Sequence, residues 1–138
     1  MGFDITRIDH ISLAAWNAED RLPLYRDVMG LSLDSVYMNE EDGFKNHLYR
    51  LPGVEPGIEF IETEHEDAMV GRFLRSKGPG FHHMSIFVKD VASAAAALEA
   101  VGIRAAGLRE TEYGPMFYIH PRDSGGVLIH VSQEHTRG

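Results

Sequence analysis

A repeated phrase constrains the fold of this chain more than any other feature. The phrases DHISL (residues 9–13) and HHMSI (residues 82–86) align, and in each a histidine, His10 or His83, is followed two residues later by a serine. Side chains two residues apart point to the same face of a strand, so each phrase predicts a strand with histidine and serine on one face. The second occurrence predicts an internal duplication into two modules.

Each phrase precedes a helical segment and three strand-like runs. The first helical segment is expected over Ala18–Val28 and ends at Gly30. The second is expected over Val91–Ala100, with Asp90 as its N-cap and Gly102 beyond its end. The strand-like runs lie at 31–38, 46–51 and 58–61 in the first half and at 103–108, 116–120 and 127–132 in the second. Both halves therefore predict the order β-α-β-β-β.

One such half cannot close a core alone, so the two halves are expected to fold together. We predict an α+β protein in which two βαβββ modules form a cupped mixed sheet around a central metal site. A single domain is expected over residues 1–138, with module 1 at about 5–62 and module 2 at about 80–134. The polar linker Thr63–Lys77 between them is expected to hold a short helix around Ala68–Leu74.

Four polar side chains interrupt apolar runs at matching positions in the two halves. His10 and His83 lie in the first strands, and Glu59 in GIEFIE and His130 in GVLIHVS lie in the fourth. An unpaired buried polar group costs about 1–3 kcal/mol, and a buried charge costs more. Each residue alone is typical of a hydrogen-bonded core group or, for Glu59, of a solvent-facing position. Together they predict one divalent metal per chain, with Zn, Co, Ni, Mn and Fe all compatible.

Composition excludes several classes of protein. The net charge of −8 argues against nucleic acid as a partner, because a phosphate-binding surface must be basic. The chain has no cysteine, which excludes disulfides and thiolate sites and fits a cytoplasmic location. No apolar run is long enough to span a bilayer, so no membrane partner is expected.

Longer phrases of the chain resemble the vicinal oxygen chelate superfamily, which includes glyoxalases, bleomycin resistance proteins and dioxygenases. The phrases are IDHISLAA, LYRDVMGLSL, GIEFIE, GFHHMSIFVKDVASAAAALEAVGI and HPRDSGGVLIHVSQ. The second half is most similar to methylmalonyl-CoA epimerases. The resemblance implies a homodimer that acts on a small molecule, such as an anion or a CoA thioester. It also implies metal ligands at His10, Glu59, His83 and His130.

Two positions depart from the epimerase pattern. His130 stands where the epimerases have a glutamate that is both ligand and acid/base. The second catalytic glutamate of the epimerases falls at Asn46, or at His47 if the gap is placed differently. The resemblance therefore gives His130, Asn46 and His47 as candidate catalytic residues, although Asn46 could bind an oxyanion but could not abstract a proton.

Three functions remain open at this point. The preferred one is a metal-dependent isomerase, epimerase or lyase that stabilises an enolate or oxyanion on a chelating, oxygen-rich substrate. The second is an Fe- or Mn-dependent oxygenase acting on an aromatic or enolic substrate. The third is a non-catalytic resistance protein that sequesters its ligand.

Overall fold

The computed structural model describes residues 2–135, which divide into two compact units. One unit combines the chain up to Asp9 with the chain from His83 onward, and the other is His10–His82. The boundary falls inside the strands β1 (Ile5–Ala15) and β5 (Gly80–Val88). In the described part the strand order is β2-β3-β4-β1-β5-β8-β7-β6 in a mixed sheet, which confirms the predicted fold class.

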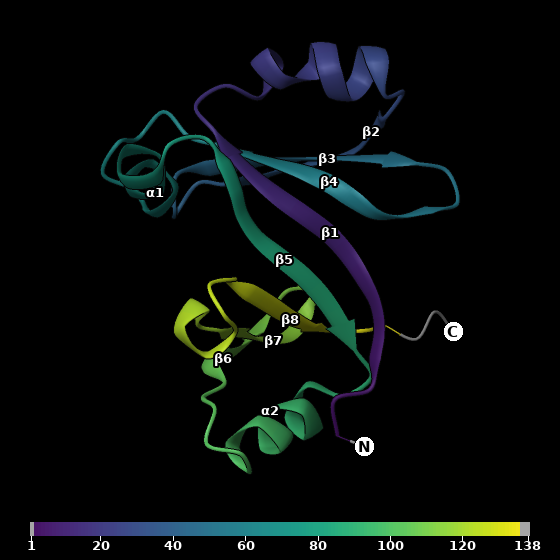
Figure 1. Ribbon diagram of the computed structural model, residues 1–138, viewed down its shortest axis with the longest axis vertical. Helices are drawn as coiled ribbons and strands as arrows, with labels where there is room; N and C mark the ends of the chain where they lie inside the picture. Colours follow the sequence, from purple (N-terminus) through teal and green to yellow (C-terminus); the bar gives the residue numbers. More distant parts are fainter. Residues whose placement is uncertain (1, 136–138) are drawn as a thin grey trace. The chain divides into compact units, whose positions relative to one another are not determined.

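The His10–His82 unit is built on β2 (Ser32–Asn39), β3 (Phe44–Leu51) and β4 (Val54–Glu62). β3 runs antiparallel to both β2 and β4, and β4 runs parallel to the second half of β1 (Figure 1). Helix α1 (Met69–Lys77) follows β4 and confirms the short helix predicted in the linker, three residues longer at its end.

The first predicted helical segment is present but is not one continuous α-helix. It consists of a 3₁₀ turn, η1 (Ala18–Arg21), and a π-helical segment, η2 (Pro23–Val28). Pro23 has no N–H and cannot continue a hydrogen-bonded helix from η1, so the second segment begins at that residue. Gly30, at φ 82°, ends the segment in the left-handed region as predicted.

Two apolar clusters lie on opposite faces of β4 because neighbouring residues of a strand point in opposite directions. Phe60 belongs to a cluster with Ala18 of η1, Leu22 between η1 and η2, Leu31 just before β2, and Tyr49 of β3. Ile61 belongs to a second cluster, with Ala14, Val70 and Leu74. The η1–η2 segment therefore covers one face of this part of the sheet, and α1 covers the other (Figure 1). This alternation decides which side chains of β3 and β4 can share a site.

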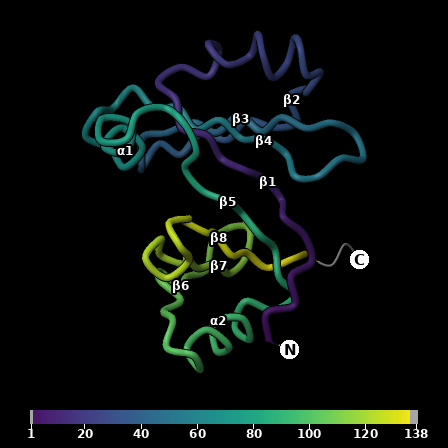
Figure 2. The backbone as a smooth tube through the Cα atoms, viewed as in Figure 1, coloured from purple at the N-terminus to yellow at the C-terminus, as the bar shows by residue number. Residues whose placement is uncertain are grey.

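The other unit contains β5, α2 (Val91–Glu99), β6 (Ala106–Thr111), β7 (Gly114–Ile119), η3 (Pro121–Asp123) and β8 (Ile129–Gln133). β8 runs parallel to β5 and antiparallel to β7, and β7 runs antiparallel to β6; Figure 2 traces this path. Asp90 caps α2 as predicted, because its Oδ1 accepts a hydrogen bond of 3.0 Å from the Ala92 N–H.

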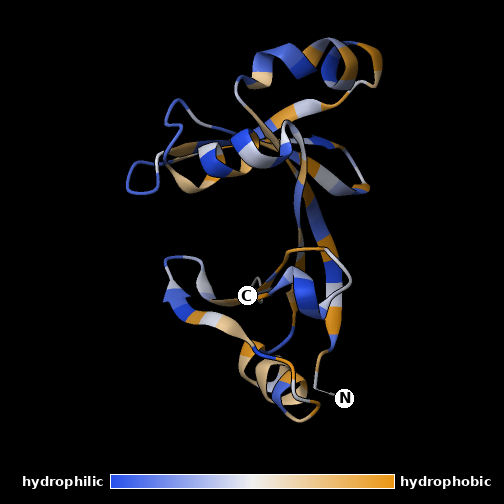
Figure 3. Ribbon diagram, turned by 60° about the vertical axis from the view of Figure 1, so that its left-hand side comes forward, coloured by the Kyte–Doolittle hydropathy of each residue, from blue (hydrophilic) through white to orange (hydrophobic). Residues whose placement is uncertain are grey.

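Helix α2 packs on this sheet through its small apolar side chains, and most of it is coloured as hydrophobic in Figure 3. Its buried residues join a core cluster with residues of β5, β7 and β8: Ile86, Val88, Val91, Ala94, Ala95, Phe117, Ile119 and Val131. The alanines allow the helix to approach the sheet closely while they favour helical backbone.

The first residues of β1 belong to this second unit. Thr6 Oγ1 donates to the Phe87 carbonyl at 3.2 Å, and Arg7 donates to both carboxylate oxygens of Glu134 at 2.9 and 3.1 Å. The compact units therefore do not divide the chain at the predicted module limits, and the single domain of two modules remains a prediction. None of the helices formed by residues 2–135 has the length and apolar character that crossing a bilayer requires.

Candidate functional site

The repeat seen in the sequence is reproduced in the strand register of each unit. In the His10–His82 unit, Ser12 on β1 lies opposite Glu59 on the parallel strand β4. In the other unit, Ser85 on β5 lies opposite His130 on the parallel strand β8. Glu59 and His130 therefore occupy equivalent positions, and His10 and His83 lie two residues before the matching serines.

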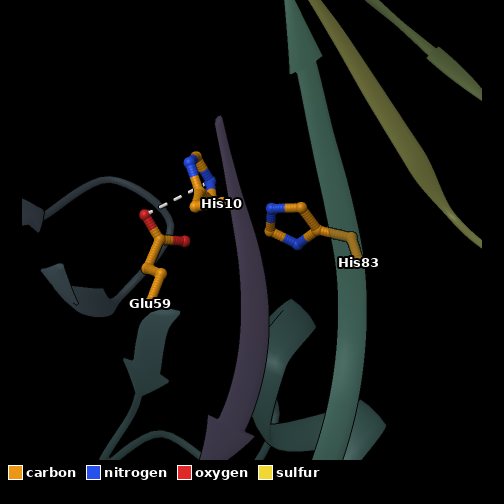
Figure 4. A group of neighbouring side chains, drawn as sticks. All are labelled: His10, Glu59 and His83. Atoms are coloured by element: carbon orange, nitrogen blue, oxygen red, sulfur yellow. Dashed lines mark ion pairs between the residues drawn. The ribbon is translucent and has the colours of Figure 1, made fainter. Parts of the chain in front are cut away.

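Glu59 is a buried carboxylate held between two side chains of β1. It is 7% exposed, and the fully buried Ser12 hydroxyl donates to its Oε1 at 2.7 Å. His10 Nε2 lies 3.6 Å from Glu59 Oε2, and a dashed line marks this pair in Figure 4. This separation is too long for a hydrogen bond. The unit thus contains a pair of a half-buried histidine and a buried glutamate, in which Ser12 fixes one carboxylate oxygen and the other faces His10.

His83 and His130 form the corresponding pair in the other unit. Their rings are stacked, with centroids 3.6 Å apart and an interplanar angle of 12°. Tyr118 on β7 packs its ring edge-on against His130, with centroids 4.6 Å apart. His83 is 3% exposed. Two adjacent strands therefore hold two imidazoles side by side, and Tyr118 limits the orientations open to the His130 ring.

Asn46 shares a face of the sheet with Glu59. On the antiparallel pair β3–β4, Leu48 lies opposite Glu59 and Asn46 lies opposite Ile61, so all four side chains point to the same side. The Asn46 Oδ1 atom is buried and has no hydrogen-bond partner within residues 2–135.

The His47 side chain points to the other face of the sheet, because His47 pairs with Phe60 in the register of β3 and β4. Its Nε2 is 2.7 Å from Glu62 Oε1, and the Ala18 N–H donates to Glu62 Oε2 at 2.8 Å. Burial alone would raise the pKa of Glu62, but the hydrogen bonds from Ala18 and His47 and the charge of His47 outweigh it and hold this pKa below its ordinary value. His47 and Glu62 thus join β3 and β4 to the start of η1, away from the Glu59 face.

The Glu62 contacts give a pH-dependent contribution to stability. A carboxylate whose pKa is lowered by folding stabilises the protein above its unfolded pKa, about 4.5, and loses this contribution as the pH falls through its folded pKa. We expect Glu62→Gln to lower the free energy of unfolding by about 1 kcal/mol at pH 7. Urea denaturation from pH 7 to pH 3 should show the difference between variant and wild type shrinking below pH 4.5. A difference that stays constant over this range would contradict the contribution of the charged carboxylate.

A cavity of about 670 Å³ lies in the His10–His82 unit, beside Glu62 rather than Glu59. Its lining includes Trp16, Lys45, Glu62 and His65. It does not include His10, Asn46 or Glu59. The cavity is therefore separate from the predicted ligand positions.

The repeat places Ser12 and Ser85 beside the histidines without indicating a role for them, and no pattern in the sequence indicates Glu62 or Tyr118. The serines could have been assigned from the repeat, since a hydroxyl two residues from a histidine shares its face. The partnership of His47 with Glu62 depends on the register between β3 and β4, which no local pattern gives.

Comparison with known proteins identifies the family of this chain. The family model of the Glyoxalase/Bleomycin resistance protein/Dioxygenase superfamily matches residues 9–118. The chain belongs to this superfamily. The match runs from the start of the first repeat to Tyr118 in β7 and confirms the resemblance carried by the longer phrases.

Several relatives within this superfamily are methylmalonyl-CoA epimerases. The mitochondrial methylmalonyl-CoA epimerase of Mus musculus is 29% identical over 132 residues, covering 92% of this chain and 72% of the mouse protein. The crystal structure of methylmalonyl-CoA epimerase from Mycobacterium tuberculosis has a TM-score of 0.82 at 26% identity, covering 96% of this chain and 91% of that one. A methylmalonyl-CoA epimerase in complex with methylmalonyl-CoA and NH4+ has a TM-score of 0.83 at 27% identity, covering 96% and 97%.

Proposed function

We propose that this protein is a divalent-metal-dependent enzyme of the methylmalonyl-CoA epimerase and glyoxalase type. The observation that carries the proposal is the register-equivalent placement of two pairs, His10 with Glu59 and His83 with His130. In the proposal, both pairs bind one metal ion. The similarity to methylmalonyl-CoA epimerases supports the reaction type.

The donor set suits a divalent transition metal. The His10 nitrogen and the Glu59 oxygen are 3.6 Å apart, which is close enough for both to bind one ion at about 2 Å each. Imidazole nitrogen with carboxylate oxygen fits Zn, Co, Ni, Mn and Fe. The hydrogen bond from Ser12 would orient Glu59 for this task, as partners of ligating carboxylates commonly do.

A bound divalent ion would supply Lewis-acid stabilisation to an enolate or oxyanion on the substrate. Three neutral imidazoles and one carboxylate leave such a site with a net positive charge, which favours an anionic chelating substrate. Two glutamates, as implied for the epimerases, would make it neutral. His130 in place of glutamate thus strengthens the field on the substrate and removes one carboxylate base.

Proton transfer in this proposal depends on His130. Moving a proton from one face of a carbon to the other requires a base on each face. Burial raises the pKa of Tyr49, which makes its phenol a poor acid, and His47 is held by Glu62 on the other face of β3. Asn46 can bind substrate but cannot take a proton. We assign one proton transfer to His130 only in a state in which its ring would not bind the metal, because a neutral imidazole that binds through one nitrogen carries its proton on the other and has no free lone pair.

The proposed substrate is a small acyl compound with two neighbouring oxygens, carried as a CoA thioester. The solved epimerase that holds methylmalonyl-CoA supports this class. We further propose a homodimer, which rests on the family resemblance. A cytoplasmic location is proposed because the chain has no cysteine.

Exchange of solvent deuterium into C2 of methylmalonyl-CoA tests the reaction. The purified protein would be loaded in turn with Zn, Co, Ni, Mn and, without oxygen, Fe(II), and the exchange followed by mass spectrometry. We expect measurable exchange with at least one metal and a loss of more than about 100-fold in Glu59→Ala. The matched control is Glu64→Ala, which removes an exposed glutamate outside the proposed ligand set. The absence of exchange with every metal would remove enolate formation at C2 from the proposal.

A further inference from the structure

We propose that Asn46 selects the substrate by accepting a hydrogen bond from a neutral donor, which makes a 2-hydroxyacyl group the preferred substrate. The inference rests on the proposed function, because it places this group on the face that carries His10 and Glu59. Methylmalonyl-CoA, which has a carboxylate in place of the hydroxyl, would then be a poorer substrate of the same reaction type.

The first observation is the unpaired amide oxygen of Asn46. Its Oδ1 is buried without a hydrogen-bond partner in the described part of the chain. Nearly all buried polar atoms in folded proteins have a partner, and leaving one unpaired is destabilising. A protein tolerates such a group where a ligand supplies the missing partner.

The second observation is the position of Asn46 on the sheet. Leu48 and Ile61, its neighbours on the same face of β3 and β4, have no polar atom in their side chains. Glu59 is the diagonal neighbour of Asn46 across β3–β4, within reach of a molecule that contacts both. Asn46 Oδ1 therefore receives no hydrogen bond from the side chains of Leu48 and Ile61, and Asn46 lies beside Glu59, the proposed metal ligand.

The chemistry of an amide defines the group it can select. An asparagine oxygen accepts from O–H or N–H, and its partial negative charge disfavours a carboxylate oxygen, which has no hydrogen to donate; the amide also cannot take a proton. In a 2-hydroxyacyl group, the hydroxyl oxygen and the carbonyl oxygen are the vicinal pair that chelates a metal. The hydroxyl hydrogen then remains available to donate to Asn46 Oδ1.

Two small anions that differ only in this donor test the proposal. Glycolate carries a 2-hydroxyl, and methoxyacetate has the same oxygen blocked by a methyl group. Isothermal titration calorimetry with the Zn-loaded protein measures both affinities. We expect glycolate to bind at least about 10-fold more tightly than methoxyacetate, because one hydrogen bond changes the affinity by about this factor. Asn46→Leu should bring the ratio of the two affinities close to one. The control His47→Gln, on the opposite face, should keep the wild-type ratio.

A second measurement needs no metal. If the unpaired oxygen is kept for a ligand, removing it should stabilise the metal-free protein, and we expect Asn46→Leu to raise the Tm by roughly 3–5 °C. A fall in Tm would show that Asn46 is a structural residue and would overturn the inference. Equal affinities of wild type for the two anions would also overturn it and leave the proposed function standing. Failure of the wild-type protein to bind Zn would overturn both.

Discussion

Replacing His83 by alanine is expected to weaken Zn binding by more than about 100-fold, and replacing His10 should have the same effect. The proposed function assigns both imidazoles to one ion. Loss of either removes one of the four proposed donors and thereby weakens the binding of a divalent transition metal. Competition against a chromophoric chelator measures the affinity, and metal analysis of the dialysed protein measures the stoichiometry.

The controls for this prediction are histidines outside the proposed ligand set. His120 and His135 are exposed, and their replacement by alanine should leave both affinity and stoichiometry unchanged. A His83→Ala protein that still binds one Zn with wild-type affinity would show that the two pairs do not share an ion. Circular dichroism of each variant would establish that a loss of affinity is not a loss of fold.

The largest effect on stability is expected for Phe60→Ala, at about 3–5 kcal/mol. Phe60 is fully buried at the centre of the cluster between β4 and η1. Its ring makes edge contacts with Tyr25 and Tyr49, at centroid distances of 5.1 and 5.8 Å. Truncation would remove these contacts and leave a cavity bounded by two aromatic rings. Urea denaturation followed by far-UV circular dichroism gives the free energy of unfolding.

Phe81→Ala is the matched control for Phe60→Ala. The substitution is chemically the same, but Phe81 is 45% exposed, so it should lower the free energy of unfolding by less than about 1 kcal/mol. Equal losses in the two variants would contradict the assignment of Phe60 to the centre of the core.

Much of the fold could be predicted because the chain carries the same pattern twice. The alternation in DHISL and HHMSI identified β1 and β5, and Asp90 marked the start of α2. The first helical segment could not be predicted in detail, since its break depends on Pro23 and on packing against β3 and β4. The start of β1 joins the second unit through contacts such as Arg7 with Glu134, 127 positions apart, which no local pattern reveals.

The equivalence of Glu59 and His130 could be predicted, because a duplication places matching residues at matching strand positions. Whether Asn46 or His47 lies on the same face as Glu59 could not be predicted. The two are adjacent, so one must face Glu59 and the other must face away, but only the register with β4 decides which. In the observed register His47 lies opposite Phe60, so its side chain points to the Phe60 face, and Asn46 is on the face of Glu59.

X-ray absorption spectroscopy of the Zn-loaded protein tests the central claim most directly. The proposed ligand set should give one Zn per chain with three imidazole nitrogens and carboxylate oxygen at about 2.0–2.2 Å. In His130→Ala the imidazole count should fall to two. Two or fewer imidazoles in the wild-type protein, or a count unchanged by His130→Ala, would contradict a single metal site made by His10, Glu59, His83 and His130.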